Sequence, residues 1–240
     1  MHQPTYLVTG GAGDIGAWVV RALVEDGANV HVLARPSDRL EALRHLPITI
    51  HEGDATDETT VQAVVKEAAG DGLEGVVHAV GSIALRPPHA LKAEAFREVI
   101  DTNLVSAFLL LSAAGKAMLR QGHGRMVFIS SVAGRLGLVN HEAVAAAKGG
   151  LESMVRAAAA TYAQRGLTVN AVAPALTETH MARQALSDAA REMSASMNPR
   201  RRNGSIEDVG QVIRWLLCDA PEHITGEIIG VDGGMGRIRS

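Results

Sequence analysis

The stretch NHEAVAAAKGG, residues 140–150, contains the two side chains of the chain best suited to acid–base chemistry. His141 and Lys148 lie seven residues apart in a segment predicted to be helical from about 141 to 165. At roughly 100° per residue they point in nearly the same direction, two turns apart. Histidine titrates near neutral pH, so His141 could donate a proton directly or through water. It could equally cap the helix start or face solvent beside Glu142.

A glycine-rich stretch, TGGAGDIG at residues 9–16, follows a predicted strand and opens a predicted helix. In that context Gly10 permits a tight turn, Gly13 lets the backbone approach a pyrophosphate, and Gly16 lets helix and strand pack closely. The helix N-terminus would face the phosphates. The alternative is an ordinary strand-to-helix turn. The residues assigned to the phosphate loop are Gly10, Gly13, Asp14, Ile15 and Gly16.

The acidic residue of this loop, Asp14, stands where a carboxylate caps free helix N–H groups. We expect it to point away from a phosphate, which would repel it.

At the end of the predicted second strand stand Ala34 and Arg35, with no acid for the adenosine ribose hydroxyls. Arg35 can pair with a 2′-phosphate, which favours NADP over NAD. The alternative is a surface arginine without a ligand.

Strand-like and helix-like segments alternate along the chain, which predicts an α/β fold with a doubly wound parallel sheet, a Rossmann fold. No linker, repeat or low-complexity tract interrupts it, so residues 1–240 form a single predicted domain. Expected strands are 5–9, 29–34, 48–53, 75–80, 125–130, 167–173 and one ending near 234; expected helices are 14–27, 37–46, 57–70, 93–122, 141–165, 178–198 and 205–219.

The formal net charge of −3 and the pI near 6.4 give no chain-wide basic field. Nucleic acid and an anionic membrane are therefore not expected partners, and a small-molecule substrate fits better. The first residues lack a signal-peptide pattern, and no segment is expected to approach the length of a membrane span, so a cytoplasmic location is predicted. The lone Cys218 is expected to be a small buried hydrophobe.

From TGGAGDIG to ITGEIIGVDGG, the chain resembles the short-chain dehydrogenase/reductase family, in the classical branch that includes the ketoacyl carrier-protein reductases. The resemblance implies a role for each matching residue. Asp54 and Ala55, in GDAT, would contact the adenine, and Gly81 is the matching residue of the turn HAVG. Asn103, in DTNLVSAF, would hold a water in the proton path. Ser131, in ISSVAG, would polarise the substrate carbonyl.

Two further roles are carried by the resemblance. Thr179 would bind the nicotinamide amide, and Lys148 would bind the nicotinamide ribose hydroxyls. In the family a tyrosine precedes the lysine by four residues, so that both lie on one helix face and the ammonium lowers the phenol pKa. Position 144, thirteen residues after Ser131, is Val144. The usual proton donor is absent, and His141 or water is the candidate replacement.

The first hypothesis is therefore an NADP-dependent oxidoreductase acting on a carbonyl or alcohol. The alternatives are a non-catalytic NADP-binding subunit and a non-redox activity, such as isomerisation or dehydration, in the same pocket. The histidines show no ligand spacing along the chain, so no metal is expected. The resemblance also implies a homo-oligomer, usually a tetramer, formed by packing the helices at about 91–121 and 141–165 against their copies.

Overall fold

A seven-stranded parallel sheet organises residues 3–238, the part of the chain that the computed structural model describes. The strand order is β3-β2-β1-β4-β5-β6-β7. The chain adds β1 to β3 toward one edge of the sheet and β4 to β7 toward the other, so the order of addition reverses between β1 and β4. That reversal confirms the predicted doubly wound α/β fold. The strands are β1 (Thr5–Thr9), β2 (Asn29–Ala34), β3 (Ile48–Glu52), β4 (Leu73–His78), β5 (Gly124–Ile129), β6 (Leu167–Pro174) and β7 (Ile228–Val231).

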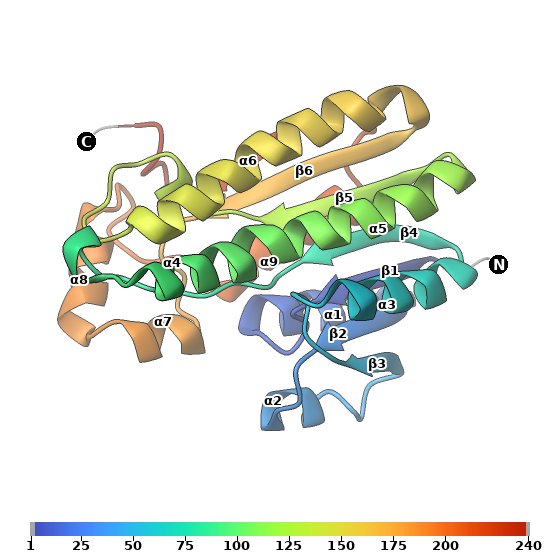
Figure 1. The fold of residues 1–240 in the computed structure, drawn as a ribbon, viewed down its shortest axis with the longest axis horizontal. Helices are drawn as coiled ribbons and strands as arrows, with labels where there is room; N and C mark the ends of the chain where they lie inside the picture. The colour runs from blue at the N-terminus through green and yellow to red at the C-terminus, as the bar shows by residue number, and fades with distance from the viewer. Residues whose placement is uncertain (1–2, 239–240) are drawn as a thin grey trace.

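Helices cover both faces of the sheet (Figure 1). α3, α5 and α6 lie on one face, and α1 and α9 pack together on the other. The helices are α1 (Asp14–Glu25), α2 (Asp38–Glu41), α3 (Glu58–Gly70), α4 (Ala93–Ile100), α5 (Ser106–Gln121), α6 (Glu142–Tyr162), α7 (His180–Ala185), α8 (Asp188–Met197) and α9 (Ile206–Cys218). Short 3-10 helices are Pro88–Ala90, Val132–Gly134 and Ala163–Arg165.

Each sheet face has its own apolar core, because successive strand residues point to opposite sides. In β1, Leu7 joins the cluster under α3, α5 and α6, whereas Val8 joins the cluster under α1 and α9. Both side chains are fully buried. Strands buried on two faces explain the continuous runs of Val, Leu and Ile that predicted a parallel sheet.

The single helix predicted over 93–122 is interrupted by a π-helical turn, Asp101–Val105. Two side chains bond to main-chain carbonyls of the preceding turn there. The Asn103 amide donates to the Val99 carbonyl at 3.0 Å, and the Ser106 hydroxyl donates to the Thr102 carbonyl at 2.6 Å. Such turns often mark functional positions, and this one points Asn103 into the interior.

Other boundaries also differ from those predicted. The segment predicted as a helix over 37–46 is α-helical only at Asp38–Glu41, since the following residues form tighter turns, with the Leu43 amide bonded to the Leu40 carbonyl. The Ser37 hydroxyl caps this short helix, because it accepts from the Leu40 amide at 3.2 Å. β4 begins two residues earlier than expected and ends at His78.

The expectation that no segment approaches a membrane span is wrong by length and composition. The helical segment Ala93–Gln121, with a mean hydropathy of 1.4 over its most apolar window, is long and apolar enough to cross a bilayer. Its apolar residues Leu110, Ala114 and Met118 are, however, completely buried against the sheet. This segment is a core helix of the α/β domain.

Candidate functional site

The predicted phosphate loop joins β1 to α1 and is shaped by its glycines. Gly10 has φ +76°, and a Cβ there would lie 2.7 Å from the Ala79 carbonyl carbon, so only glycine fits. Gly13 is exposed and is the N-cap of α1, with no side chain bonded to the helix end. The first-turn N–H groups are therefore available to an anion, which fits a dinucleotide pyrophosphate.

Asp14 does not cap α1, contrary to the prediction. Its carboxylate accepts from the Arg39 guanidinium and, at 2.6 Å, from the His180 amide at the start of α7. Burial raises the pKa of this carboxyl, whereas the hydrogen bonds from Arg39 and His180 lower it. The lowering outweighs the effect of burial, so the pKa of Asp14 is below its ordinary value. These contacts turn the carboxylate toward Arg39 and α7, and its orientation relative to a bound phosphate stays a prediction. Asp14 thus joins the phosphate loop to the segment after β6.

The residues predicted to select the cofactor lie at the ends of β2 and β3. Ala34 is buried and Arg35 is exposed. The Asp54 carboxylate accepts from the amide and hydroxyl of Thr56, at 2.9 and 2.8 Å. These bonds and the nearby charge of Arg35 lower the pKa of Asp54 despite its partial burial. Arg35 and Asp54 therefore lie close enough for their charges to interact, at the ends of β2 and β3, and Ala55 is buried.

Asn103 and Lys148 both approach Gly81, an arrangement that the sequence alone did not specify. A Cβ on Gly81 would lie 3.1 Å from Asn103 Oδ1 and 3.7 Å from Lys148 Nζ. Asn103 accepts from the Ser82 amide at 3.2 Å, which fixes its side chain to the β4 loop. Lys148 donates to the Ile129 carbonyl at 2.8 Å, and burial lowers its pKa to about 8.

The segment carrying Ser131 lies directly against the helix turn of Lys148. Gly134 touches that turn, since a Cβ there would lie 3.0 Å from the Lys148 carbonyl carbon and 3.1 Å from the Gly149 nitrogen. The Ser131 hydroxyl accepts from the Ala133 amide at 3.2 Å. Its hydrogen is therefore free to donate to a substrate oxygen.

An ion pair between a partly exposed arginine and a buried glutamate, which sequence reasoning missed, holds this segment in place. Arg135 Nε lies 2.9 Å from Glu152 Oε2, and the Arg135 guanidinium also donates to the Ile228 carbonyl. The Ser130 hydroxyl donates to Glu152 Oε1 at 2.9 Å. Glu152 follows Lys148 by four residues, so both lie on one face of α6. No sequence motif predicts this ion pair, because Arg135 and Glu152 meet only after β5, α6 and β7 pack together.

Val144 is buried in a small apolar cluster with Val99, Ala133, Ala143 and Ala147. Neither tyrosine of the chain lies near Lys148. Tyr6 lies on β1, where the Cys218 thiol donates to its hydroxyl. Tyr162 ends α6, fourteen residues or about 21 Å along the helix from Lys148, with its hydroxyl over Gly115.

His141 precedes the first residue of α6 and is partly exposed. Its side chain does not cap the helix, so that interpretation is wrong. Instead Nδ1 lies 2.8 Å from the Val139 carbonyl. Because a carbonyl only accepts, Nδ1 carries hydrogen in this contact and Nε2 is left for another partner.

Thr179 uses its hydroxyl locally, since it accepts from the Ala182 amide as the N-cap of α7.

A second residue that sequence reasoning missed is His78, the last residue of β4 and fully buried. Its Nε2 lies 2.8 Å from the Ser106 hydroxyl. Burial, and secondarily the charge of Lys148, lower the His78 pKa to about 3. His78 is therefore a neutral neighbour of Lys148.

The family model described as Enoyl-(Acyl carrier protein) reductase matches residues 10–236, nearly the whole chain. The chain belongs to the short-chain dehydrogenase/reductase family. It is 34% identical over 230 residues to the 3-oxoacyl-[acyl-carrier-protein] reductase MabA of Mycobacterium tuberculosis, covering 96% of this chain and 92% of that protein. It is 36% identical over 237 residues to cis-4-hydroxycyclohexanecarboxylate dehydrogenase of Sinomonas cyclohexanicum, covering 95% and 94%.

Solved structures of short-chain dehydrogenase/reductases agree with this assignment. Actinorhodin polyketide ketoreductase with NADPH superposes with a TM-score of 0.91 at 27% identity, over 98% of both chains. A short-chain type dehydrogenase/reductase from Mycobacterium ulcerans gives 0.91 at 31% identity, over 98% of this chain and 90% of that one. The protein is therefore an NAD(P)-dependent oxidoreductase of the short-chain dehydrogenase/reductase type.

Proposed function

We propose that the chain is an NADP-dependent oxidoreductase that interconverts a carbonyl and an alcohol on a small-molecule substrate. The observation that carries the proposal is the meeting of Asn103 and Lys148 at Gly81, with the Ser131 segment packed on the Lys148 turn. A chain that only bound a dinucleotide would not need a hydroxyl donor held beside a buried lysine. The named substrates of the relatives, oxoacyl chains and a cyclic hydroxy acid, are all of this chemical class.

The residues at the strand ends fit NADP. Gly10, Gly13, Asp14, Ile15 and Gly16 form the loop for the pyrophosphate, and Arg35 supplies a positive charge for a 2′-phosphate. Asp54 and Ala55 would border the adenine, whereas Gly81, Lys148 and Thr179 would border the nicotinamide half. When bound, the nicotinamide supplies or accepts a hydride at the substrate carbon.

Reduction of a carbonyl also needs a proton at the substrate oxygen. Ser131 would donate a hydrogen bond to that oxygen and polarise the carbonyl. Val144 occupies the position where the family has its tyrosine, so the proton must come from another group. We propose His141 or a water held by Asn103 as that group. Lys148, whose pKa is about 8, can hold or release a proton near neutral pH and would keep such a water polarised.

A second candidate is a non-catalytic NADP-binding subunit. The burial of Val144 among apolar side chains favours it, because such surroundings place no polar group where the phenol would stand. A non-redox reaction in the same pocket, which needs no phenol, is the third candidate. All three candidate proteins would bind NADP at the same site. They differ in whether a substrate is converted and in whether NADPH is oxidised during that conversion.

The deciding experiment compares wild type with His141→Ala and Val144→Tyr. NADPH and NADP are titrated by fluorescence, and a panel of ketones and alcohols is assayed with each protein. Loss of a general acid costs roughly 10²- to 10⁴-fold in rate. We expect His141→Ala to lose turnover in that range with unchanged NADPH affinity.

Turnover that appears only in Val144→Tyr would instead support the non-catalytic subunit. Absence of binding of either cofactor would refute the oxidoreductase proposal altogether. Substrate loss without oxidation of NADPH would support a non-redox reaction.

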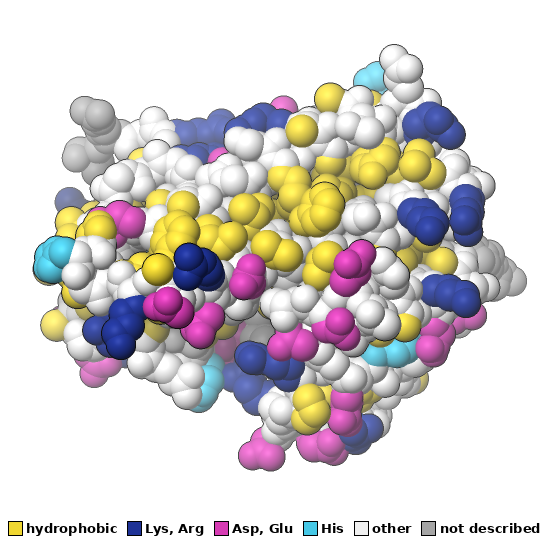
Figure 2. Space-filling model, in the orientation of Figure 1, with side chains coloured by type: hydrophobic (Ala, Val, Ile, Leu, Met, Phe, Trp, Pro, Cys, Tyr) yellow, Lys and Arg dark blue, Asp and Glu magenta, His cyan; other side chains and the backbone are white. Residues whose placement is uncertain are grey.

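We further propose a cytoplasmic homo-oligomer, a tetramer, that buries the outer faces of α5 and α6. Hydrophobic side chains gather over these helices on the face shown in Figure 2. Phe108 is 53% exposed, and Phe96 and Val105 are also exposed along the same helical segment. Large exposed apolar side chains along one helical segment, including two aromatic residues, are typical of a protein–protein interface.

A further inference from the structure

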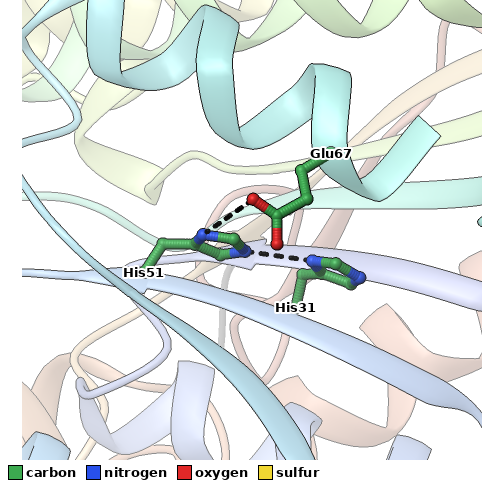
Figure 3. A group of neighbouring side chains, drawn as sticks. All are labelled: His31, His51 and Glu67. Atoms are coloured by element: carbon green, nitrogen blue, oxygen red, sulfur yellow. Dashed lines mark hydrogen bonds and ion pairs between the residues drawn. The ribbon is translucent and has the colours of Figure 1, made fainter. Parts of the chain in front are cut away.

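Two histidines and a glutamate meet outside the oxidoreductase site, between the edge of the sheet and α3 (Figure 3). His31 lies on β2, His51 on the edge strand β3, and Glu67 on α3. In the parallel pairing, His51 stands opposite Leu33, two residues after His31, so the two rings are diagonal neighbours on the same sheet face. The chain separates these residues by at least 16 positions, and only the fold brings them together.

The two imidazoles point their nitrogens at each other. His31 Nδ1 lies 3.0 Å from His51 Nε2, and the rings are nearly parallel, with an interplanar angle of 12°. Two nitrogens bound to one tetrahedral Zn²⁺, at about 2.0–2.1 Å each, lie roughly 3.3 Å apart. The present spacing therefore needs only a few tenths of an ångström of opening to accept a metal ion.

Asp71 fixes the tautomer that metal binding requires. Its Oδ2 lies 3.2 Å from His31 Nε2. A carboxylate accepts, so Nε2 of a neutral His31 carries the hydrogen and Nδ1 presents its lone pair toward His51. A carboxylate behind a histidine in this way is the usual support of a metal-ligating imidazole.

Glu67 offers a third candidate ligand. Its carboxylate reaches toward the two rings from α3, and the candidate ligand atoms of the three residues all lie within 4.8 Å of one another (Figure 3). Its side chain is 62% exposed, so it can rotate onto a metal at little cost. At present Oε2 lies 4.0 Å from His51 Nδ1.

Charge and access also suit a divalent cation. Two neutral imidazoles with the carboxylates of Glu67 and Asp71 give the group a charge that offsets a doubly charged ion. His31 is buried, but the exposed side chains of Glu67 and Asp71 leave an entry path from solvent.

We propose that His31, His51 and Glu67 bind one zinc-like divalent cation that links β2, β3 and α3, with Asp71 as the supporting partner of His31. Nitrogen and oxygen donors in this number suit Zn²⁺, with water completing a tetrahedral set. This proposal replaces the expectation of no metal, which rested on the absence of ligand spacing along the chain. It is independent of the proposed oxidoreductase function.

The test uses the full-length protein without an affinity tag and ZnCl₂ as the probe. Zinc affinity and stoichiometry are measured by competition with a chromophoric chelator for wild type, His51→Gln and Glu67→Gln. The matched control is His123→Gln, which removes a surface histidine that also faces a carboxylate, Glu74, at 3.4 Å. Binding of Co²⁺ is followed by its visible absorption, which is intense for tetrahedral sites.

We expect wild type and His123→Gln to bind one zinc ion per chain with the same affinity. His51→Gln should lose at least tenfold in affinity and should lose the Co²⁺ spectrum. At a zinc concentration 100-fold above Kd, the Tm of wild type should rise by about 5–10 °C. Asp71→Asn should weaken binding by roughly 10- to 100-fold.

Absence of a saturable site in wild type would overturn the proposal, as would equal zinc affinity in wild type and Glu67→Gln. Because Glu67 is exposed, Glu67→Gln keeps the test decisive even if a histidine variant fails to fold. Far-UV circular dichroism in the presence of a chelator checks folding of each variant.

Discussion

His78 Nε2 lies 2.8 Å from the Ser106 hydroxyl, which itself donates to the Thr102 carbonyl at 2.6 Å. The hydroxyl hydrogen is used by Thr102, so the serine oxygen accepts and His78 carries its hydrogen on Nε2. Among residues 3–238, Nδ1 of His78 has no hydrogen-bond partner. A second proton would place a positive charge on this fully buried ring beside the charge of Lys148, which accounts for a pKa near 3.

This arrangement predicts acid sensitivity. An unfolded histidine binds a proton below pH about 6.5, but folded His78 does not until about pH 3, so the unfolded state gains stability as the pH falls. His78 should cost up to roughly 3 kcal/mol of stability between pH 6.5 and 4. Urea unfolding at several pH values checks this. His78→Asn should reduce the slope of the free energy of unfolding against pH by an amount that corresponds to about one proton. An unchanged slope would contradict the assignment of this effect to His78.

The ion pair of Arg135 and Glu152 predicts a strongly coupled pair of variants. Glu152 is almost fully buried, so Arg135→Met leaves a carboxylate without its partner, at a cost of about 3–5 kcal/mol. Replacing both residues by Met should cost clearly less than the sum of the two single changes. Denaturant unfolding of the four proteins in a double-mutant cycle measures the coupling. Additive costs would show that the pair does not act as a unit.

Gly134 predicts a steric link between the Ser131 segment and α6. Gly134→Ala should push this segment away from Lys148 and cost about 1–3 kcal/mol, because both sides of the contact are main chain. Gly137→Ala, three residues later, is the matched control, since an added Cβ there meets no atom within 4 Å. Thermal unfolding checks stability, and kcat for a substrate found in the panel checks the site. Equal behaviour of the two variants would refute the link.

The sequence predicted the alternation of strands and helices, the glycine-rich turn between β1 and α1, and the helical settings of Asn103 and Lys148, because each depends on local signals. Glycines at a strand-to-helix turn and apolar residues at fixed periods are visible in a single sequence. Asn103, in the turn Asp101–Val105, and Lys148, on α6, are brought together because these two helical segments pack against each other on one face of the sheet.

The contacts that support the site could not be predicted in the same way. Arg135 meets Glu152, and His78 meets Ser106, across elements whose relative rotation no local pattern specifies. His31 and His51 show the limit most clearly, because their spacing in the chain has no meaning until β2 and β3 pair in register. The failed prediction that Asp14 caps α1 has a similar cause, since a distant arginine competes for its carboxylate.

Arg35 predicts cofactor selectivity. If its exposed guanidinium binds the 2′-phosphate, Arg35→Ala removes a charge-assisted contact of about 1.5–3 kcal/mol, which weakens NADPH binding by roughly 10- to 100-fold. NADH, which lacks that phosphate, should bind equally to both proteins. Arg44→Ala is the control, because Arg44 is also exposed nearby but pairs with Glu41 and Glu52. Isothermal titration with both cofactors decides, and an equal loss for NADPH and NADH would exclude a phosphate contact.

Phe108 predicts the interface of the proposed tetramer. A large aromatic side chain that is 53% exposed on α5 would be a central contact if α5 packs against a copy of itself. Phe108→Glu would bury a charge there and should weaken association at least thirtyfold, or about 2 kcal/mol. Met193→Glu changes a similarly exposed residue on α8 and should leave the assembly intact. Light scattering coupled to size exclusion measures the mass, and a Phe108→Glu protein that keeps the wild-type mass would place the interface elsewhere.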